Sequence, residues 1–512
     1  MADTWQEENE RIFALMEQGD FARAIDLAGR QAARVGAEEG EDSPRMAIVH
    51  HNLGELYLMT GEAGKARQEF QRSLDVYQAR SLADSPEVVE TLTNLAELDL
   101  GEGLLGKAGE RMERVAAILE GRLEELERWL HAMHNLAAIR QAEGRKGESR
   151  EALEKGLLQG ELHLGGDHPH LSHFLRGLAA LDLEAGQLDG AEERLRRAIA
   201  ILEKNDGAET PEFATCLGSL AQVYLLRGHV AAAEPFFNQS LEILRATLGP
   251  EHPECGALLE KVAAMHLATG KKEQAEKTLQ EVVKCYLASL GQDDETSAQA
   301  QNALAELHID AGRHEAAYPL VQASLAARQK VLGKKHPAVA QSHNNLGVVH
   351  ALRGEKTLAL KEHGKALEIR EQVFGGEHPA VTQSLDNIAA IHQERGEHDR
   401  AEELLLRSLA IWEKAQGADH PVVAQACHNL AVLYIAAQRF DEAEKQLFAA
   451  RKVLEKGGER VKPHLATVFK TFSELYRKMG RVGESKEYRA RAENILKPQG
   501  GRGGMASTVP VH

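Results

Sequence analysis

One glycine-rich segment of the chain has the residue types of a nucleotide-binding loop. Residues 101–108, GEGLLGKA, fit the GxGxxG spacing of dinucleotide-binding turns and nearly fit the phosphate-binding loop GxxxxGK[ST]. The phosphate-binding loop needs Ser or Thr after the Lys to place a hydroxyl on magnesium, but Ala108 stands at that position. Both loops also follow a β-strand, whereas the neighbouring sequence has the pattern of helices. We therefore interpret the segment as a turn between two helices.

Two pairs of histidines could supply metal ligands. His131 and His134 are spaced one helical turn apart, as are His170 and His173. A metal site needs three or four converging ligands, and no Cys or carboxylate is spaced to complete a set. The sequence contains neither HExxH nor GxSxG. It predicts no metal site, no cofactor and no catalytic residues, so we expect that the protein is not an enzyme.

The late part of the chain carries a repeated pair of amide side chains. Each pair places a Gln four residues before an Asn and recurs after 42 residues: Gln341 with Asn345, Gln383 with Asn387, and Gln425 with Asn429. Residues four apart share one face of a helix. Amides both donate and accept hydrogen bonds, as the backbone of an extended peptide requires. We expect these side chains to bind a peptide. The alternative is that the Asn residues brace neighbouring helices.

The early part of the chain has the same Asn at Asn52, Asn94 and Asn135, and we expect these residues to contact a peptide as well. A neutral-to-basic stretch accompanies them: His51, His131, His134, His173 and Arg176. Histidine titrates at about pH 6.5, so we expect this stretch to bind an acidic segment more tightly at about pH 6 than at about pH 7.5. The middle units have other residues at the Asn position, which leaves open whether there is one pocket or two: Gly177, Ser219, Lys261 and Ala303.

The candidate residues described above occur at fixed positions of a sequence repeat with a period of 42 residues. His-Pro pairs recur on it at His168, His252, His336, His378 and His420. Proline suits the first turn of a helix, and the His before it either caps the helix or is solvated. Nine residues after the Asn position stands a Gly, with Gln438 as the exception, and five residues later usually an Ala. Gly accepts the left-handed conformation that ends a helix. Repetition at this spacing predicts twelve stacked helix–turn–helix units.

Composition limits the classes of partner. The net charge of −17 argues against nucleic acid, which requires basic patches. Four cysteines without CxxC spacing predict free thiols in a reducing compartment. No stretch approaches the ~18 apolar residues of a membrane span, and the acidic N-terminus has no secretory signal. We expect a cytoplasmic protein with one solenoid over residues 1–496 and a disordered tail over residues 497–512.

The repeat resembles a known family. Leu53-Gly54-x2-Tyr57, with Gly61 and Ala66-x3-Phe70 after it, matches the tetratricopeptide pattern. The segment from His378-Pro379 to His420-Pro421 is similar to the 42-residue repeats of kinesin light chain and its relatives. The resemblance implies an all-α, right-handed superhelical solenoid whose first helices line a concave face. It also implies that the matching Asn positions contact cargo peptides. The Lys/Asn clamp of chaperone-binding relatives is not matched, because His51/Glu55, Asn344/Val348 and His428/Val432 occupy its positions.

These observations favour an adaptor that binds extended peptide segments of partner proteins in its concave groove. A second hypothesis is a regulatory sensor whose solenoid closes around a signalling peptide or small ligand. An enzyme with a nucleotide site at residues 101–108 is the third. The identity of the partner and the oligomeric state stay open.

Overall fold

The computed structural model describes residues 2–82, 84–85, 87–205 and 207–496. These residues form α-helices and three short 3-10 helices, and none of them lies in a strand. The predicted tail, residues 497–512, lies outside the described residues. Within the described residues, no helix is both long enough and apolar enough to span a membrane.

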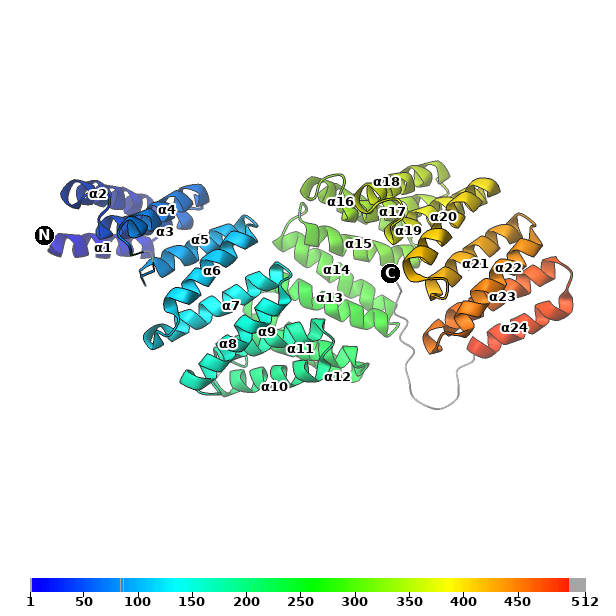
Figure 1. Ribbon diagram of the computed structural model, residues 1–512, viewed down its shortest axis with the longest axis horizontal. Helices are drawn as coiled ribbons and strands as arrows, with labels where there is room; N and C mark the ends of the chain where they lie inside the picture. The colour runs from blue at the N-terminus through cyan, green and yellow to red at the C-terminus, as the bar shows by residue number, and fades with distance from the viewer. Residues whose placement is uncertain (1, 83, 86, 206, 497–512) are drawn as a thin grey trace. The chain divides into compact units, whose positions relative to one another are not determined.

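The described residues divide into two compact units, one that ends at Arg227 and one that begins at Gly228. Figure 1 labels the helices of both units. The helices of the first unit are α1 (Ala2–Glu17), α2 (Phe21–Glu39), α3 (Pro44–Met59), α4 (Ala63–Ala79), α5 (Val88–Gly101), α6 (Leu105–Leu119), η1 (Leu123–Glu125), α7 (Leu126–Ala142), α8 (Lys146–Leu164), α9 (Leu171–Glu184), α10 (Leu188–Lys204) and α11 (Pro211–Leu226).

The second unit begins with α12 (Val230–Thr247). It continues with α13 (Pro253–Ala268), α14 (Lys272–Ser289), α15 (Glu295–Asp310), α16 (His314–Val331), α17 (Pro337–Leu352), α18 (Lys356–Phe374), η2 (Pro379–Val381), α19 (Thr382–Glu394), α20 (His398–Gln416), α21 (Pro421–Ala436), α22 (Phe440–Glu455), η3 (Glu459–Val461), α23 (Lys462–Lys478) and α24 (Val482–Leu496). Within each unit, helices that follow one another in the chain pack together, as in α3 with α4 and α17 with α18.

The His-Pro pairs start helices as N-caps. In all five of them the His side chain accepts a hydrogen bond from the backbone N–H two residues later, through Nδ1: His168, His252, His336, His378 and His420. Proline follows in the first turn, where its missing N–H costs nothing. Of the two roles predicted for these histidines, the capping role is the observed one.

The turn glycines have the expected left-handed backbone. Gly396, for example, has φ +75° and lies between α19 and α20. Gln438 takes the same place between α21 and α22 with φ +60°. An L-residue in this conformation costs about 1–2 kcal/mol, which Gly avoids.

The small residue predicted in the second helix of each repeat is an Ala in ten of the repeats. Every Ala at this position has no exposed surface: Ala24, Ala66, Ala108, Ala191, Ala233, Ala275, Ala317, Ala359, Ala401 and Ala443. Ser149 takes the place of Ala in α8 and is equally buried. The residue type at this position therefore reflects the distance between two helix axes, as the sequence predicted.

Polar side chains join consecutive repeats at a constant spacing. The Tyr434 hydroxyl donates to Glu402 Oε1 (2.7 Å), and 42 residues later the Tyr476 hydroxyl donates to Glu444 Oε1 (2.6 Å). In the first unit the Tyr224 hydroxyl donates to Glu192 Oε1 in the same way (3.2 Å), and another copy of the contact is an ion pair between Arg150 Nη2 and Asp182 Oδ1 (2.8 Å). Each bond links the first helix of one repeat to the second helix of the repeat before it.

We expect Gln438→Gly to stabilise the protein by about 0.5–1 kcal/mol. The substitution removes about 1–2 kcal/mol of left-handed strain and adds about 0.5–1 kcal/mol of chain entropy to the unfolded state. Chemical denaturation followed by circular dichroism measures the change. The matched control, Gly396→Gln, should destabilise by a similar amount, and a stabilising effect of that control would contradict the argument.

Candidate functional site

Two of the predicted late amide residues lie in a hydrogen-bonded network between α15 and α17. Gln341 Nε2 donates to Asn345 Oδ1 (3.2 Å) within α17. Asn345 Nδ2 donates back across the repeat boundary to Asn302 Oδ1 (3.0 Å) and to Glu306 Oε1 (2.8 Å) in α15. Asn345 is buried. Both of its amide donor bonds therefore go to the preceding repeat.

The other two late Asn residues also contact the preceding repeat. Asn387 Nδ2 donates to Asn344 Oδ1 (2.9 Å), and Asn429 Nδ2 approaches Asp386 Oδ2 at 3.5 Å. Burial raises the pKa of the Asp386 carboxyl to about 6. In all three cases the partner stands 43 residues earlier, directly before the Asn position of the previous repeat. In the free protein each of these Asn side chains thus connects the first helix of its own repeat to the first helix of the preceding repeat.

The Gln residues of the pairs are more accessible than the Asn residues. Gln383 and Gln425 are exposed, and Gln341 is half-buried. Gln425 Nε2 donates to Asn429 Oδ1 (3.0 Å) within α21. The amide pairs thus combine an inner Asn with an outer Gln.

A buried arginine connects two of these outer Gln residues. Arg370, in α18, is only 7% exposed. Its Nη2 donates to Gln341 Oε1 (3.0 Å) and to Gln383 Oε1 (2.8 Å), and its Nη1 donates to Ser384 Oγ (2.8 Å). Burial lowers the pKa of Arg370. No carboxylate of the described residues pairs with this guanidinium.

The equivalent residue one repeat earlier shows what Arg370 lacks. Arg328 is also buried, and its Nε donates to Glu295 Oε1 (3.1 Å). Its Nη1 donates to Ser342 Oγ (3.1 Å), the counterpart of Ser384. The position equivalent to Glu295 in the next repeat is Pro337. The sequence therefore contained a signal for this site. Arg328 and Arg370 are one period apart, but an acidic residue stands at the partner position only for Arg328.

The early residues are arranged differently. Asn52 in α3 is buried, whereas Asn94 in α5 and Asn135 in α7 are half-buried. Within the described residues, these three make no bond to the preceding repeat like those of the late Asn residues. The structure thus separates the early Asn residues from the late ones by their contacts.

Four of the early histidines form two neighbouring pairs between α7 and the start of α9. The ring centroids of His131 and His170 are 5.6 Å apart, and those of His134 and His173 are 5.5 Å apart. Burial, followed by repulsion from His173, lowers the pKa of His134 to about 4. Burial also lowers the pKa of His173. The expected gain of charge near pH 6 is therefore wrong for His134 and moves to lower pH for His173.

Residues 101–108 are a turn, as predicted. Gly101 ends α5, Gly103 has φ +74°, and Leu105 begins α6. The backbone N–H of Leu104 donates to the carbonyl of Asp99 (2.8 Å), which closes the helix end. Elsewhere in the described chain, no three His, Cys, Asp or Glu side chains converge in a way that could hold a metal ion.

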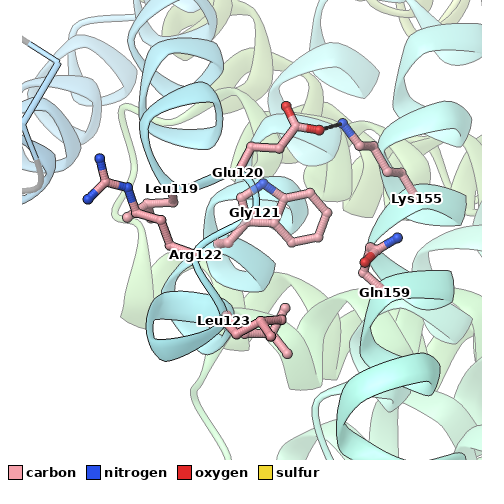
Figure 2. A pocket seen from close by; sticks show the side chains of 9 residues that line it. Leu119, Glu120, Gly121, Arg122, Leu123, Lys155 and Gln159 are labelled. Carbon is pink, nitrogen blue, oxygen red and sulfur yellow. Dashed lines mark hydrogen bonds and ion pairs between the residues drawn. The ribbon is translucent and has the colours of Figure 1, made fainter.

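A cavity of about 220 Å³ lies beside the connection between α6 and α7 (Figure 2). Trp129, Leu119 and Leu123 line it, together with an ion pair between Lys155 Nζ and Glu120 Oε1 (2.6 Å). The sequence prediction missed this cavity. Its only signal was the interval from Asn94 to Asn135, which is 41 residues instead of 42.

Comparison with known proteins identifies the repeat. A family model described as tetratricopeptide repeat matches residues 8–79, 129–204, 212–288, 296–372, 357–411 and 380–456, more than half of the chain. No curated protein matches the chain.

Several solved structures are similar to parts of the chain. BtubC (BKLC) from P. vanneervenii is 21% identical, with a TM-score of 0.39 over 45% of this chain and 91% of its own. The TPR-like repeats of a kinesin light chain candidate from Podosopora anserina are 25% identical, with a TM-score of 0.36 over 40% of this chain and 97% of their own. A point variant of the latter gives 24% identity and the same TM-score and coverage.

We expect Asn387→Ala to lower the free energy of unfolding by about 1 kcal/mol, the usual worth of one intramolecular hydrogen bond. Asn344 Oδ1 keeps a second partner, His363 Nδ1 (3.1 Å), so the loss should not reach the cost of an unsatisfied buried group. Denaturant titration measures the change. Asn94→Ala, which removes no bond to a preceding repeat, is the control and should have a smaller effect.

We expect the folded state to lose stability in acid because of His134. Its folded pKa of about 4 lies below the unfolded value of about 6.5, so the unfolded chain binds more protons between these values. Stability should therefore fall as the pH drops from about 6.5 towards 4, by about 2 kcal/mol at pH 5 from this group alone. Unfolding of the wild type and of His134→Gln at pH 7 and pH 5 measures the difference. An equal acid loss in both proteins would contradict the assignment.

Proposed function

Because the chain belongs to the tetratricopeptide repeat family, whose members mediate protein–protein interactions, we propose that it is an adaptor that binds an extended acidic segment of a partner protein. The proposed site is the late amide cluster, Gln341, Gln383 and Asn387 with Arg370. The repeat family is a non-catalytic scaffold, which agrees with a binding role.

The observation that supports this proposal is the unpaired charge of Arg370. A buried guanidinium without a carboxylate costs several kcal/mol, because neutral amide oxygens replace its hydration only in part. At Arg328 the carboxylate of Glu295 offsets this cost by forming an ion pair with the guanidinium. A ligand carboxylate at Arg370 would supply the negative charge that Pro337 does not, and hydrogen bonds between two charged groups are stronger than those to neutral amides.

The amide side chains suit the backbone of the same ligand. Gln383 and Gln425 are exposed and lie one repeat apart on α19 and α21. Each amide offers two donor hydrogens and one acceptor oxygen, so it can bond to the N–H and the C=O of an extended chain. Asn387 donates to Asn344 in the free protein, so we assign it to the support of this surface and to ligand contact only if that bond opens.

The net charge of −17 sets the expected character of the binding. An acidic ligand is repelled at long range, so electrostatic steering does not accelerate association. The attraction acts at short range around Arg370, where water is largely excluded. Differences in affinity between ligands should therefore come mainly from the dissociation rate constant, which depends on how well one ligand carboxylate fits against Arg370.

We expect Arg370→Gln to weaken the binding of acidic peptides at least about tenfold, which corresponds to about 1.4 kcal/mol. The measurement uses an array of extended peptides of about ten residues, each made with Glu and with Gln at its centre. Wild-type protein should prefer the Glu member of a pair, and Arg370→Gln should lose this preference. The free energy of unfolding should stay constant or rise, because an uncompensated buried charge is removed.

Arg328→Gln is the matched control. It leaves Glu295 without its partner, so it should destabilise the protein and leave the Glu preference intact. If Arg370→Gln destabilises the protein and the Glu and Gln peptides bind equally to the wild type, Arg370 is a structural residue and the proposal fails.

A further inference from the structure

A second arginine without a carboxylate partner lies in the first unit. Arg176 is in α9, three residues after His173, and is half-buried. Its Nε is fully buried and has no hydrogen-bond partner. No ion pair joins its guanidinium to an acidic residue among those that the structure describes. The head group therefore has hydrogen-bond donors that the folded chain does not use.

The surroundings of Arg176 are donors as well. α7 and α9 contact each other (Figure 1), and His134 of α7 pairs with His173 of α9 at 5.5 Å between ring centroids. A neutral imidazole carries one N–H, so each ring can donate one hydrogen bond without being protonated. His131 and His170 form the next pair, about one helical turn away.

The charges around these rings decide between a cation and an anion. Repulsion from Arg176 contributes to the lowered pKa of both His134 and His173. The same guanidinium would repel a divalent metal ion at the rings. Two acidic residues act on the cluster from a distance, Glu127 of α7 on His170 and Glu212 of α11 on His173, and neither forms an ion pair there. The cluster therefore disfavours a metal ion and offers its donors to an anion.

We propose that Arg176, His134 and His173 form a binding site for the phosphate group of a phosphate monoester. The guanidinium can donate two parallel hydrogen bonds to two phosphate oxygens. A carboxylate has two oxygens, and when both face the guanidinium no third oxygen remains to point towards the imidazoles. A phosphate monoester has three terminal oxygens, so it can accept from Arg176 and from both rings.

This site is independent of the function proposed above. It uses other residues in the other compact unit, and its ligand differs in the number of acceptor oxygens. A phosphorylated Ser of a partner protein and a small phosphorylated metabolite would present the same group, so the test distinguishes these sources from free phosphate.

Calorimetric titration of the full chain tests the proposal with three probes: O-phosphoserine, inorganic phosphate and glutamate. We expect O-phosphoserine to bind and glutamate to bind at least about tenfold more weakly, a difference of about 1.4 kcal/mol. Equal affinity for inorganic phosphate would support the site and assign it to the phosphate group itself. Binding of O-phosphoserine alone would support the site and assign it to an ester. In Arg370→Gln, which lacks the carboxylate site proposed above, glutamate binding as tightly as O-phosphoserine would overturn the proposal.

Substitutions locate the site. Arg176→Gln and His173→Gln should each weaken O-phosphoserine binding at least about fivefold, roughly 1 kcal/mol. Arg197→Gln is the control, because Arg197 is an exposed arginine of the same unit that pairs with Glu161 on the surface, and its affinity should stay unchanged. Unchanged binding by Arg176→Gln would overturn the assignment.

A melting experiment on the wild type covers the case in which a variant fails to fold. A ligand that binds only the folded state raises the melting temperature. O-phosphoserine should raise it more than glutamate at equal concentration and ionic strength, and Arg370→Gln should show the same rise. Equal effects of the two ligands on Arg370→Gln would overturn the proposal without any variant of Arg176.

Discussion

Close approach of two helices at one small residue is the constraint on which the stack depends. Where a second helix carries this Ala, as α20 does with Ala401, the residue has no exposed surface, so its methyl group is fully enclosed. A larger side chain would move the helix axes apart, and a packed interior does not absorb such a change locally. Because consecutive repeats within a unit contact each other, one displaced pair would also change the position of the next repeat in that unit. The remaining contacts of the fold form only if the two helices of each repeat keep this separation between their axes.

Polar contacts between repeats are more tolerant than this apolar one. Tyr434 with Glu402 and Arg150 with Asp182 hold equivalent positions in the repeat, between α20 and α21 in one case and between α8 and α9 in the other. One is a neutral-to-charged hydrogen bond and the other an ion pair. The bonds between first helices vary in the same way, as Asn387 with Asn344 and His428 with Thr471 show. What the repeat preserves is the meeting of two complementary side chains, and the chemistry of the pair can differ from unit to unit.

Periodicity made the interior of each repeat predictable. The turn at Gly396, the buried Ala401 and the cap at His378 follow from backbone conformation and helix packing, which depend on residues close in sequence. The peptide-binding role of Asn387 was inferred from its helix face and from the resemblance to kinesin light chain repeats. Its bond to Asn344 joins two repeats, and a period cannot show which side chains meet across that boundary. The pairing of His134 with His173 and the missing counter-ion of Arg370 escaped prediction for the same reason.

The contrast between Arg328 and Arg370 bears on how a repeat array can acquire new properties. Both copies keep the Arg and the Ser that accepts from it, and they differ at the site of the acid, Glu295 in one and Pro337 in the other. A charged group that can bind a ligand can thus result when one repeat has the Arg but not its carboxylate partner, while the neighbouring repeats keep the array folded. Because the other repeats keep the protein folded, one repeat can contain a buried charge without a counter-ion. A single globular core of the same size would tolerate such a charge less well.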